Sequence, residues 1–167
     1  MKKTVAVVLL LFILALSGCA VKEAAAFEYI ECPVAPDQPM FYLSADIPSG
    51  AMLTASSNEG RSAVFLHEDF TVMEEIFPAD SLDEALLYLT GQTAEALQPI
   101  QVAAFPQEEY RFAWTAAGEP ESTVCSGTLF YDGSFFYALT VQCDAAVGKE
   151  YRTVFSDMLE SATLEVV

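Results

Sequence analysis

The chain has 167 residues, and its 24 acidic and 7 basic residues give it a formal net charge of −17 at pH 7. Hydrophobic residues make up 53% of it, which is enough for a packed core and excludes a wholly disordered chain. The scarcity of Lys and Arg excludes nucleic-acid binding, which needs clustered basic side chains to displace phosphate counterions, and it excludes attraction to an anionic lipid surface.

The first 19 residues carry the features of an export signal. Lys2 and Lys3 precede an apolar stretch at residues 5–16, and small residues lead from there to Cys19. A charged start, a short apolar run and small residues are typical of a secretory signal. The run is shorter than the roughly 20 residues that a membrane-spanning helix needs. An ordinary secretory signal with a coincidental cysteine is the alternative interpretation.

Leu16-Ser17-Gly18-Cys19 resembles the lipobox of bacterial lipoproteins. The resemblance implies cleavage between Gly18 and Cys19, removal of the signal peptide 1–18, and attachment of a diacylglycerol to the Cys19 thiol. We therefore expect an exported protein that is lipid-anchored on the extracytoplasmic face of the cell membrane. Two acyl chains give stable attachment where one does not. Loss of the two lysines changes the net charge from −17 to −19.

Residues 19–40 are expected to form the lipidated start, a short tether and a proline-rich lead-in. The Ala-rich tether 20–26 reaches on the order of 25 Å when fully extended, which would keep the domain close to the membrane. Three prolines between residues 32 and 40 predict an irregular loop, because proline disfavours both helices and central strands. Residues 41–167 then form a single predicted domain.

The first half of this domain predicts short strands followed by one helix. Turn residues separate the predicted strands, which are 41–47, 51–55, 63–67 and 70–77. A helix is predicted over residues 80–91. Ser81 and Glu84 fit a capping box there, Leu82, Ala85, Leu86 and Leu89 form one apolar face, and Gly91 is typical of a helix end.

The second half predicts an antiparallel meander and a final helix. The predicted strands are 100–105, 109–115, 123–131 and 134–143, with a two-residue hairpin turn at Asp132-Gly133. An apolar stripe of Tyr151, Val154, Phe155, Met158 and Leu159 predicts a helix over residues 148–161. The last two strands are apolar on both faces, so both faces of the sheet must be covered. The predicted fold class is α+β, with an antiparallel sheet flanked by helices.

This order of elements resembles the PsbP-like α/β/α sandwich over roughly residues 40–165. The segments that carry the resemblance are Glu109-Tyr110-Arg111-Phe112, Gly127 through Gly133, Phe136-Tyr137-Ala138-Leu139 and Tyr151 through Leu159. The family includes photosystem accessory proteins and many small bacterial lipoproteins, and it is mostly known for binding. The resemblance implies a fold and a binding role, but a fold alone does not define a function.

The sequence offers little for catalysis or for metal binding. His67 is the single histidine, and its neighbours Glu68 and Asp69 would alternate sides along a strand. A metal ligand or general base is one interpretation, but a zinc site built on several histidines is excluded, and a polar histidine at a strand end is favoured. The sequence contains none of the common phosphate-loop, nucleophile-elbow or metalloprotease motifs. We expect no catalytic residue, no metal, no cofactor and no enzymatic activity.

Three cysteines remain after lipidation: Cys32, Cys125 and Cys143. An exported chain meets a compartment that permits disulfides, and an odd number leaves at least one thiol unpaired. Three alternatives stay open: buried free thiols, a bridge from Cys32 to Cys125 or Cys143, and a Cys125–Cys143 bridge. A two-residue turn at Asp132-Gly133 would place Cys125 and Cys143 on opposite faces, whereas a three-residue loop or a bulge would place them on one face.

Two further groups of residues are candidate sites. The aromatic residues either line a ligand groove or belong to the core, and their alternation on adjacent strands favours the core. They are Tyr110, Phe112, Trp114, Phe135, Phe136 and Tyr137. The acidic pairs Glu74-Glu75 and Glu108-Glu109 are expected to be solvated charges at the sheet edge.

The favoured function is a membrane-anchored, non-enzymatic binding or assembly accessory protein. Its acidic surface would face a protein partner that carries a basic patch. Acidic residues that merely keep the domain soluble are the plainer interpretation of the same charge. The alternative function is a receptor for a small ligand or a cation, with a pocket between the sheet and a helix.

Overall fold

The computed structural model describes residues 38–57, 59–116 and 123–167. The predicted signal peptide, Gly18, Cys19, the tether and Cys32 lie outside these residues. In chain order the elements are β1 (Phe41–Ser44), β2 (Met52–Ser56), β3 (Ser62–Leu66), β4 (Phe70–Phe77), α2 (Leu82–Thr90), α3 (Ala94–Leu97), β5 (Ile100–Ala103), β6 (Glu108–Thr115), β7 (Thr123–Tyr131), β8 (Phe136–Asp144), α4 (Ala145–Glu150), α5 (Arg152–Ser161) and β9 (Thr163–Val166).

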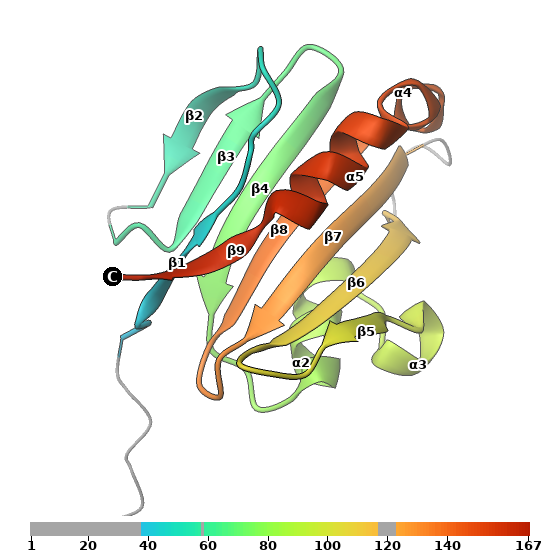
Figure 1. Ribbon diagram of the computed structural model, residues 1–167. Coiled ribbons are helices and arrows are strands. Elements are labelled where there is room, and N and C mark those ends of the chain that lie inside the picture. The colour runs from blue at the N-terminus through green and yellow to red at the C-terminus, as the bar shows by residue number, and fades with distance from the viewer. Residues whose placement is uncertain (1–37, 58, 117–122) are drawn as a thin grey trace, which may run out of the picture. The chain divides into compact units, whose positions relative to one another are not determined.

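Seven strands form one antiparallel sheet in the order β2-β3-β4-β8-β7-β6-β5 (Figure 1). The chain runs from one edge to β4, and then passes through α2 and α3 to the opposite edge. From there β5 to β8 return to the middle, so that β8 pairs with β4 and Val141 lies opposite Val72. The centre of the sheet therefore joins segments that are far apart in the sequence.

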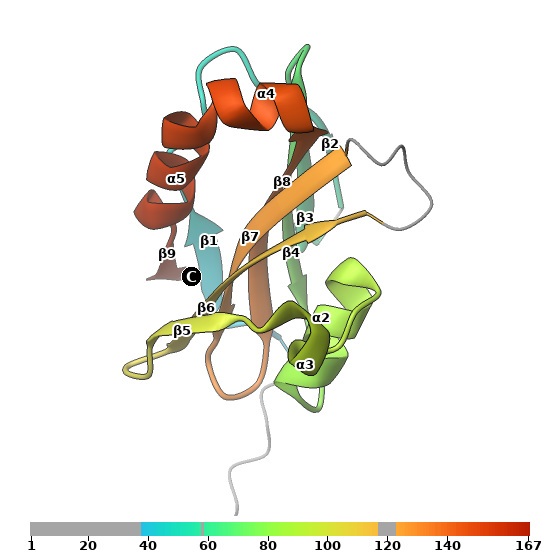
Figure 2. The same cartoon turned by 90° about the vertical axis from the view of Figure 1, so that its right-hand side faces the viewer.

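Both faces of the sheet are covered, as the sequence predicted. Figure 2 shows α2 and α3 on one face, and α5 with the two-stranded β1–β9 sheet on the other. β8 explains this arrangement, because alternate residues along it enter two separate cores. Tyr137 and Leu139 pack with Phe155 and Met158 of α5, whereas Phe136 packs on the α2 side. The fold is α+β with a large antiparallel sheet.

The α2 helix begins and ends where the sequence predicts. Ser81 Oγ accepts the Glu84 N–H at 3.2 Å, and Gly91 ends the helix in the left-handed region at φ 72°. The Glu84 carboxylate accepts the N–H of Asp80 at 2.8 Å instead of that of Ser81. The capping box is therefore present with its return bond displaced by one residue.

The predicted helix 148–161 is two helices. The Asp144 carboxylate accepts the Ala146 N–H at 2.8 Å, so that α4 already begins at Ala145. The chain then bends at Tyr151, and α5 follows. The apolar stripe is confirmed at Phe155, Met158 and Leu159, but Val154 is 41% exposed. The opposite side of the two helices faces water, and its exposed residues include Lys149, Glu150, Arg152, Thr153 and Asp157.

The hairpin between β7 and β8 differs from the predicted register. Tyr131 lies opposite Phe136, and the tip of the turn is Gly133-Ser134. Asp132 causes this shift, because its Oδ1 accepts the N–H groups of Ser134 and Phe135, each at 2.8 Å. The observed pairing is displaced by an even number of residues, which preserves the side of the sheet that each residue faces.

The C-terminal strand β9 is not among the predicted elements. It pairs with β1, with Phe41 opposite Val166, and the Tyr42 hydroxyl donates a hydrogen bond to Glu165. Residues 38–167 hold both cores and all of the described strands, so we expect this part of the chain to fold by itself. None of the helices in the described ranges is long and apolar enough to cross a membrane.

Candidate functional site: a groove beneath helix α5

A groove of about 480 Å³ lies between α4–α5 and strands β6 to β8. This volume is in the range typical of small-ligand sites, about 300–1,000 Å³. The surface inside it is mostly apolar. Val141, Cys143 and Phe155 are buried along its inner side, and Ala113 and Ser126 lie on its floor.

The position of α5 over the sheet explains why this space exists. α5 lies over β8 and β7, and the sheet continues beyond it to β6 and β5 (Figure 1). On this face Ala113 is opposite Ser126, and Ser126 is opposite Val141. Two small side chains side by side cannot fill the gap beside the helix, so that Ala113 stays exposed. The groove is therefore a direct result of residue size and strand register.

Gly148 lets α4 close one end of the groove tightly. A Cβ atom at this position would meet Val124 Cγ2 at 3.2 Å and Cys143 Sγ at 3.4 Å. The contact with Val124 is tighter than usual, so a side chain at this position would require Val124 or α4 to shift slightly. The glycine therefore permits a close approach of α4 to β7–β8 at this end.

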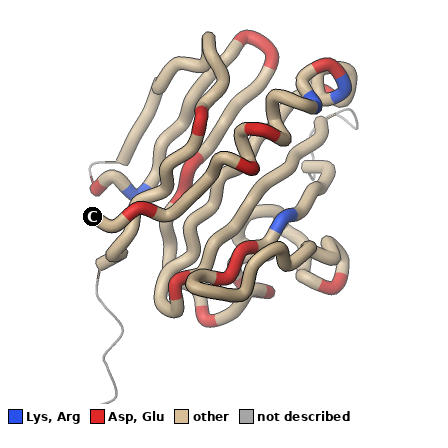
Figure 3. Tube along the Cα trace, viewed as in Figure 1, with Lys and Arg blue, Asp and Glu red and all other residues tan. Residues whose placement is uncertain are grey.

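The same end of the groove carries positive charge. Lys149 and Arg152 belong to its lining, which contains no Asp or Glu. Neither base forms an ion pair with any residue in the described ranges. Basic positions are few on the trace, and the α4–α5 end holds two of them (Figure 3).

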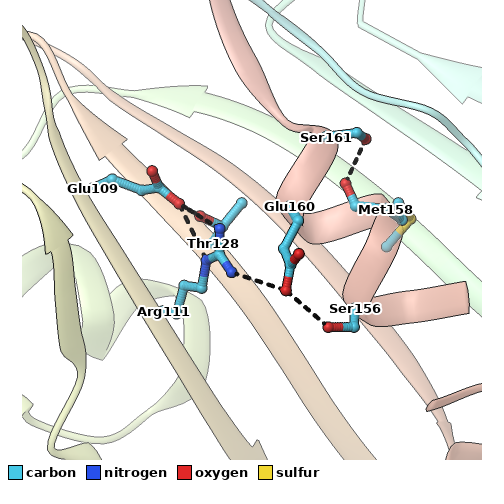
Figure 4. Close-up of polar contacts among 7 residues, drawn as sticks. All are labelled: Glu109, Arg111, Thr128, Ser156, Met158, Glu160 and Ser161. Atoms are coloured by element: carbon cyan, nitrogen blue, oxygen red, sulfur yellow. Dashed lines mark hydrogen bonds and ion pairs between the residues drawn. The ribbon is translucent and has the colours of Figure 1, made fainter. Parts of the chain in front are cut away.

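A polar network ties α5 to β6 beyond the groove (Figure 4). Arg111 donates from Nε and Nη2 to Glu109 Oε1, each at 3.1 Å, and its Nη1 lies 3.5 Å from Glu160 Oε1. Ser156, which also lines the groove, donates to the same Glu160 oxygen at 3.1 Å. Arg111 is therefore neutralised by two carboxylates, unlike Lys149 and Arg152.

Cys125 and Cys143 are both buried and free. Cys125 lies opposite Gln142 and Cys143 opposite Val124, so the two side chains point to opposite faces of the sheet. Burial, with a smaller effect of the nearby Cys143, raises the pKa of Cys125 to about 11. Burial and then Asp144 raise the pKa of Cys143. Both thiols are therefore protonated at neutral pH, which makes them poor nucleophiles.

His67 lies outside the groove lining, directly after β3. Its ring stacks on Phe70 with the centroids 4.3 Å apart, and its Nδ1 accepts the Asp69 N–H at 3.2 Å. Tyr151 donates to the Asp69 carboxylate at 3.1 Å, which links this turn to the start of α5. Across the described ranges no three His, Cys, Asp or Glu residues come together as a metal site.

The six aromatic residues belong to the two cores, which confirms the interpretation that the sequence favoured. The expectation for the acidic pairs is wrong at Glu109, which pairs with Arg111 and keeps only 18% of its side chain exposed. Glu74 is half-buried as well, and burial raises its pKa. Neither carboxylate is a simple solvated charge at the sheet edge.

The sequence predicts a pocket between the sheet and a helix, but it does not identify the residues that line it. Lys149 and Arg152, three residues apart in an acid-rich chain, are the signal that could have suggested it. Ala113 and Ser126 give no such signal, because only the strand register brings them together. No protein-family model matches the sequence, and no curated protein matches it.

Proposed function

We propose that this chain is a non-enzymatic binding protein that takes a small, largely apolar ligand into the groove beneath α5. The observation that carries the proposal is the groove itself, an apolar space of about 480 Å³ with open access and small floor residues. Burying an apolar ligand there is favourable, by about 25 cal/mol for each Å² removed from water. This proposal selects the small-ligand alternative over the accessory role that the sequence favoured.

The chemistry of the lining supports binding without catalysis. Its hydroxyl groups, Ser126 and Ser156, have no histidine beside them, because His67 lies at the β3–β4 turn. The thiols of Cys125 and Cys143 have raised pKa values. A nucleophile needs an adjacent base or a lowered pKa to be reactive, and the described part of the groove supplies neither.

The location of the protein and its finer fold are part of the same proposal. Export and lipidation at Cys19 rest on the lipobox, and they would hold the groove within reach of the membrane. A PsbP-like α/β/α sandwich is supported by the antiparallel sheet with helices on both faces. A small domain that binds a ligand near a membrane is compatible with the binding roles of that family.

A groove-filling substitution tests the proposal. The chain from residue 20 onward retains all of the described residues and can be studied without detergent. We expect it to bind the neutral fluorescent probe N-phenyl-1-naphthylamine. Ala113→Phe should lower the probe affinity by about tenfold or more, equivalent to about 1.4 kcal/mol. The matched control is Ala146→Phe, because Ala146 is exposed on α4 and does not line the groove.

Thermal unfolding measured in parallel shows whether each variant is folded. Equal probe binding by the wild-type chain and a folded Ala113→Phe variant would exclude the groove as the site. Failure of the wild-type chain to bind any apolar probe would remove the proposed function.

A protein partner with a basic patch remains the second candidate, and the α2–α3 face favours it. The sequence has no Lys or Arg between Arg61 and Arg111. On α2, the apolar residues Leu87 and Tyr88 are 49% and 63% exposed. The acidic residues of this face include Asp83 and Glu95. If this face binds a partner, Asp83→Lys with Glu95→Lys should abolish crosslinking in native membranes, and high salt should weaken it. Crosslinking that is unaffected by the double substitution and by high salt would exclude this candidate.

A further inference from the structure

We propose that the ligand of the α5 groove is a single-chain amphiphile with an anionic head group. The alkyl chain would lie on the apolar floor, and a carboxylate or phosphate head would lie against Lys149 and Arg152. This inference rests on the proposed function, and it adds the chemical class of the ligand.

The shape and surface of the groove favour an alkyl chain. The space is an open channel between a helix and a sheet, with Val141, Phe155 and Leu159 along one side. Its small floor residues, Ala113 and Ser126, allow a narrow chain to approach the sheet. An unbranched chain can follow such a channel and bury apolar surface along its whole length.

The two bases favour an anionic head at one end of that channel. Lys149 and Arg152 are three residues apart across the α4–α5 junction, and both line the groove although both are exposed to water. A head group held by them would therefore stay at the rim, in contact with solvent. Their positive charges are not neutralised by the described carboxylates, so they remain available for a charge-assisted hydrogen bond.

The rest of the chain makes this local charge significant. A net charge of −17 repels anions at long range, so an anion binds only where bases are concentrated. Asp144, Glu150 and Asp157 are the described acids closest in sequence to Lys149 and Arg152. All three are exposed, and none of them lines the groove.

The polar network sets the direction of the ligand. At the Ser156 end of the groove, the ion pair between Arg111 and Glu160 bridges β6 and α5 (Figure 4). The charges at this end therefore neutralise each other. The free positive charge is at the opposite end, at Lys149 and Arg152. The head group would therefore lie at the α4–α5 junction, with the alkyl chain running toward Ser156.

Displacement of the bound neutral probe by matched alkyl compounds tests this inference. We expect dodecanoate or dodecyl phosphate to bind at least about tenfold more tightly than dodecanol, equivalent to about 1.4 kcal/mol. Dodecyltrimethylammonium should bind most weakly. The preference for the anion should shrink as salt rises, because the two bases are exposed. Preference for dodecanoate would identify a fatty-acid-like head, and preference for dodecyl phosphate a lipid phosphate.

The variant that removes the two charges is Lys149→Gln with Arg152→Gln. It should lose the preference for anions and bind the anions and dodecanol about equally. Arg61→Gln is the matched control, because Arg61 lies outside the groove and pairs with Glu59 at 3.4 Å. It should keep the full preference for anions.

Two negative outcomes have different meanings. If dodecanol and the anions bind the wild-type chain equally, the anionic head is excluded while the apolar ligand site stands. If neither the probe nor any alkyl compound binds, the proposed function fails together with this inference.

Discussion

Phe155 belongs both to the core and to the groove. Its ring packs edge-on against Phe70 at 5.1 Å between centroids and stacks with Tyr151 at 5.7 Å, and the residue is only 6% exposed. The same side chain forms part of the groove wall. The core that holds α5 on the sheet therefore also determines the shape of the site.

Phe155→Ala should lower the free energy of unfolding by about 3–5 kcal/mol, because it removes buried surface and leaves a cavity. That is a large share of the roughly 5–15 kcal/mol that a domain possesses. Asp157→Ala, two positions away on the exposed side, should change the stability little. Chemical denaturation of both variants provides the comparison, and equally small effects would mean that this stripe does not hold α5.

Glu74 is a half-buried carboxylate on β4 that has no hydrogen bond or ion pair with the described residues. Burial raises its pKa above the ordinary value of 4.5. The folded state therefore binds this proton more tightly than the unfolded state does. The associated stability is fully present below about pH 4.5 and is lost as the pH rises through the raised value.

Glu74→Gln should therefore raise the melting temperature at neutral pH, and this gain should disappear in acid below about pH 4.5. The adjacent Glu75 accepts a hydrogen bond from the Tyr88 hydroxyl at 3.2 Å. Glu75→Gln should give no such gain, which makes it the control. The measurement is the melting temperature of both variants from neutral pH down to acid pH. A lower melting temperature of Glu74→Gln at neutral pH would show instead that the charge of Glu74 stabilises the fold.

At the scale of elements, the network around Arg111 fixes position more than it adds stability. Arg111 and Glu160 keep 33% and 58% of their side chains exposed, so solvent and salt screen their attraction. Exposed pairs of this kind contribute about 0–1 kcal/mol. The apolar contacts of α5 provide most of its stability, and the network sets its distance from β6.

The N-cap of α2 gives a prediction at this scale. Ser81→Ala should cost about 0.5–2 kcal/mol of unfolding free energy, because the Glu84 N–H loses its hydrogen-bond acceptor. Thr93 stands at the N-cap of α3 and makes no side-chain cap hydrogen bond. Thr93→Ala should therefore have a much smaller effect in the same denaturation assay. Equal costs would mean that the Ser81 bond is not what stabilises α2.

Elements with local signals could be predicted from the sequence. The α2 helix has its cap, its apolar face and Gly91 within a dozen residues, and both ends agree with the structure. β9 has only four residues, and its partner β1 lies at the other end of the domain, so no local pattern reveals it. The sequence predicts a turn at Asp132-Gly133, but its tip is Gly133-Ser134. The reason is that the Asp132 carboxylate accepts the N–H groups of Ser134 and Phe135.

The groove illustrates the same limit at the site. The sequence suggested a pocket between the sheet and a helix, because an apolar helix stripe and an apolar sheet face must meet. Its residues could not be named, since they depend on the register that brings Ala113 beside Ser126 and on where α5 crosses the sheet. The bend at Tyr151, which separates Lys149 on α4 from Arg152 on α5, was also not predicted.

At the scale of the molecule, the two faces of the sheet differ. The α5 face carries the apolar groove, the paired Arg111 and the two groove bases Lys149 and Arg152, whereas neither α2 nor α3 carries a Lys or Arg (Figures 2 and 3). The lipid predicted at Cys19 would hold the domain near a membrane. A ligand with an alkyl chain would be available at that location.

Cys19→Ser tests the anchor. The variant should accumulate as unprocessed or unlipidated protein, and it should leave the detergent phase on phase partitioning, because no diacylglycerol can be attached. Processing and partitioning identical to the wild-type chain would show that the lipobox interpretation is wrong. Replacement of Cys125 by Ser should leave both properties unchanged, because that thiol lies in the sheet.

The most direct test of the central claim is to map the ligand onto the fold by NMR. The chain from residue 20, labelled with ¹⁵N, is titrated with dodecanoate while its amide resonances are followed. We expect the largest shifts at Ser126, Gly148, Arg152 and Ser156, and none in α2 or α3. Shifts confined to the α2–α3 face, or no shifts at saturating ligand, would contradict a binding site beneath α5.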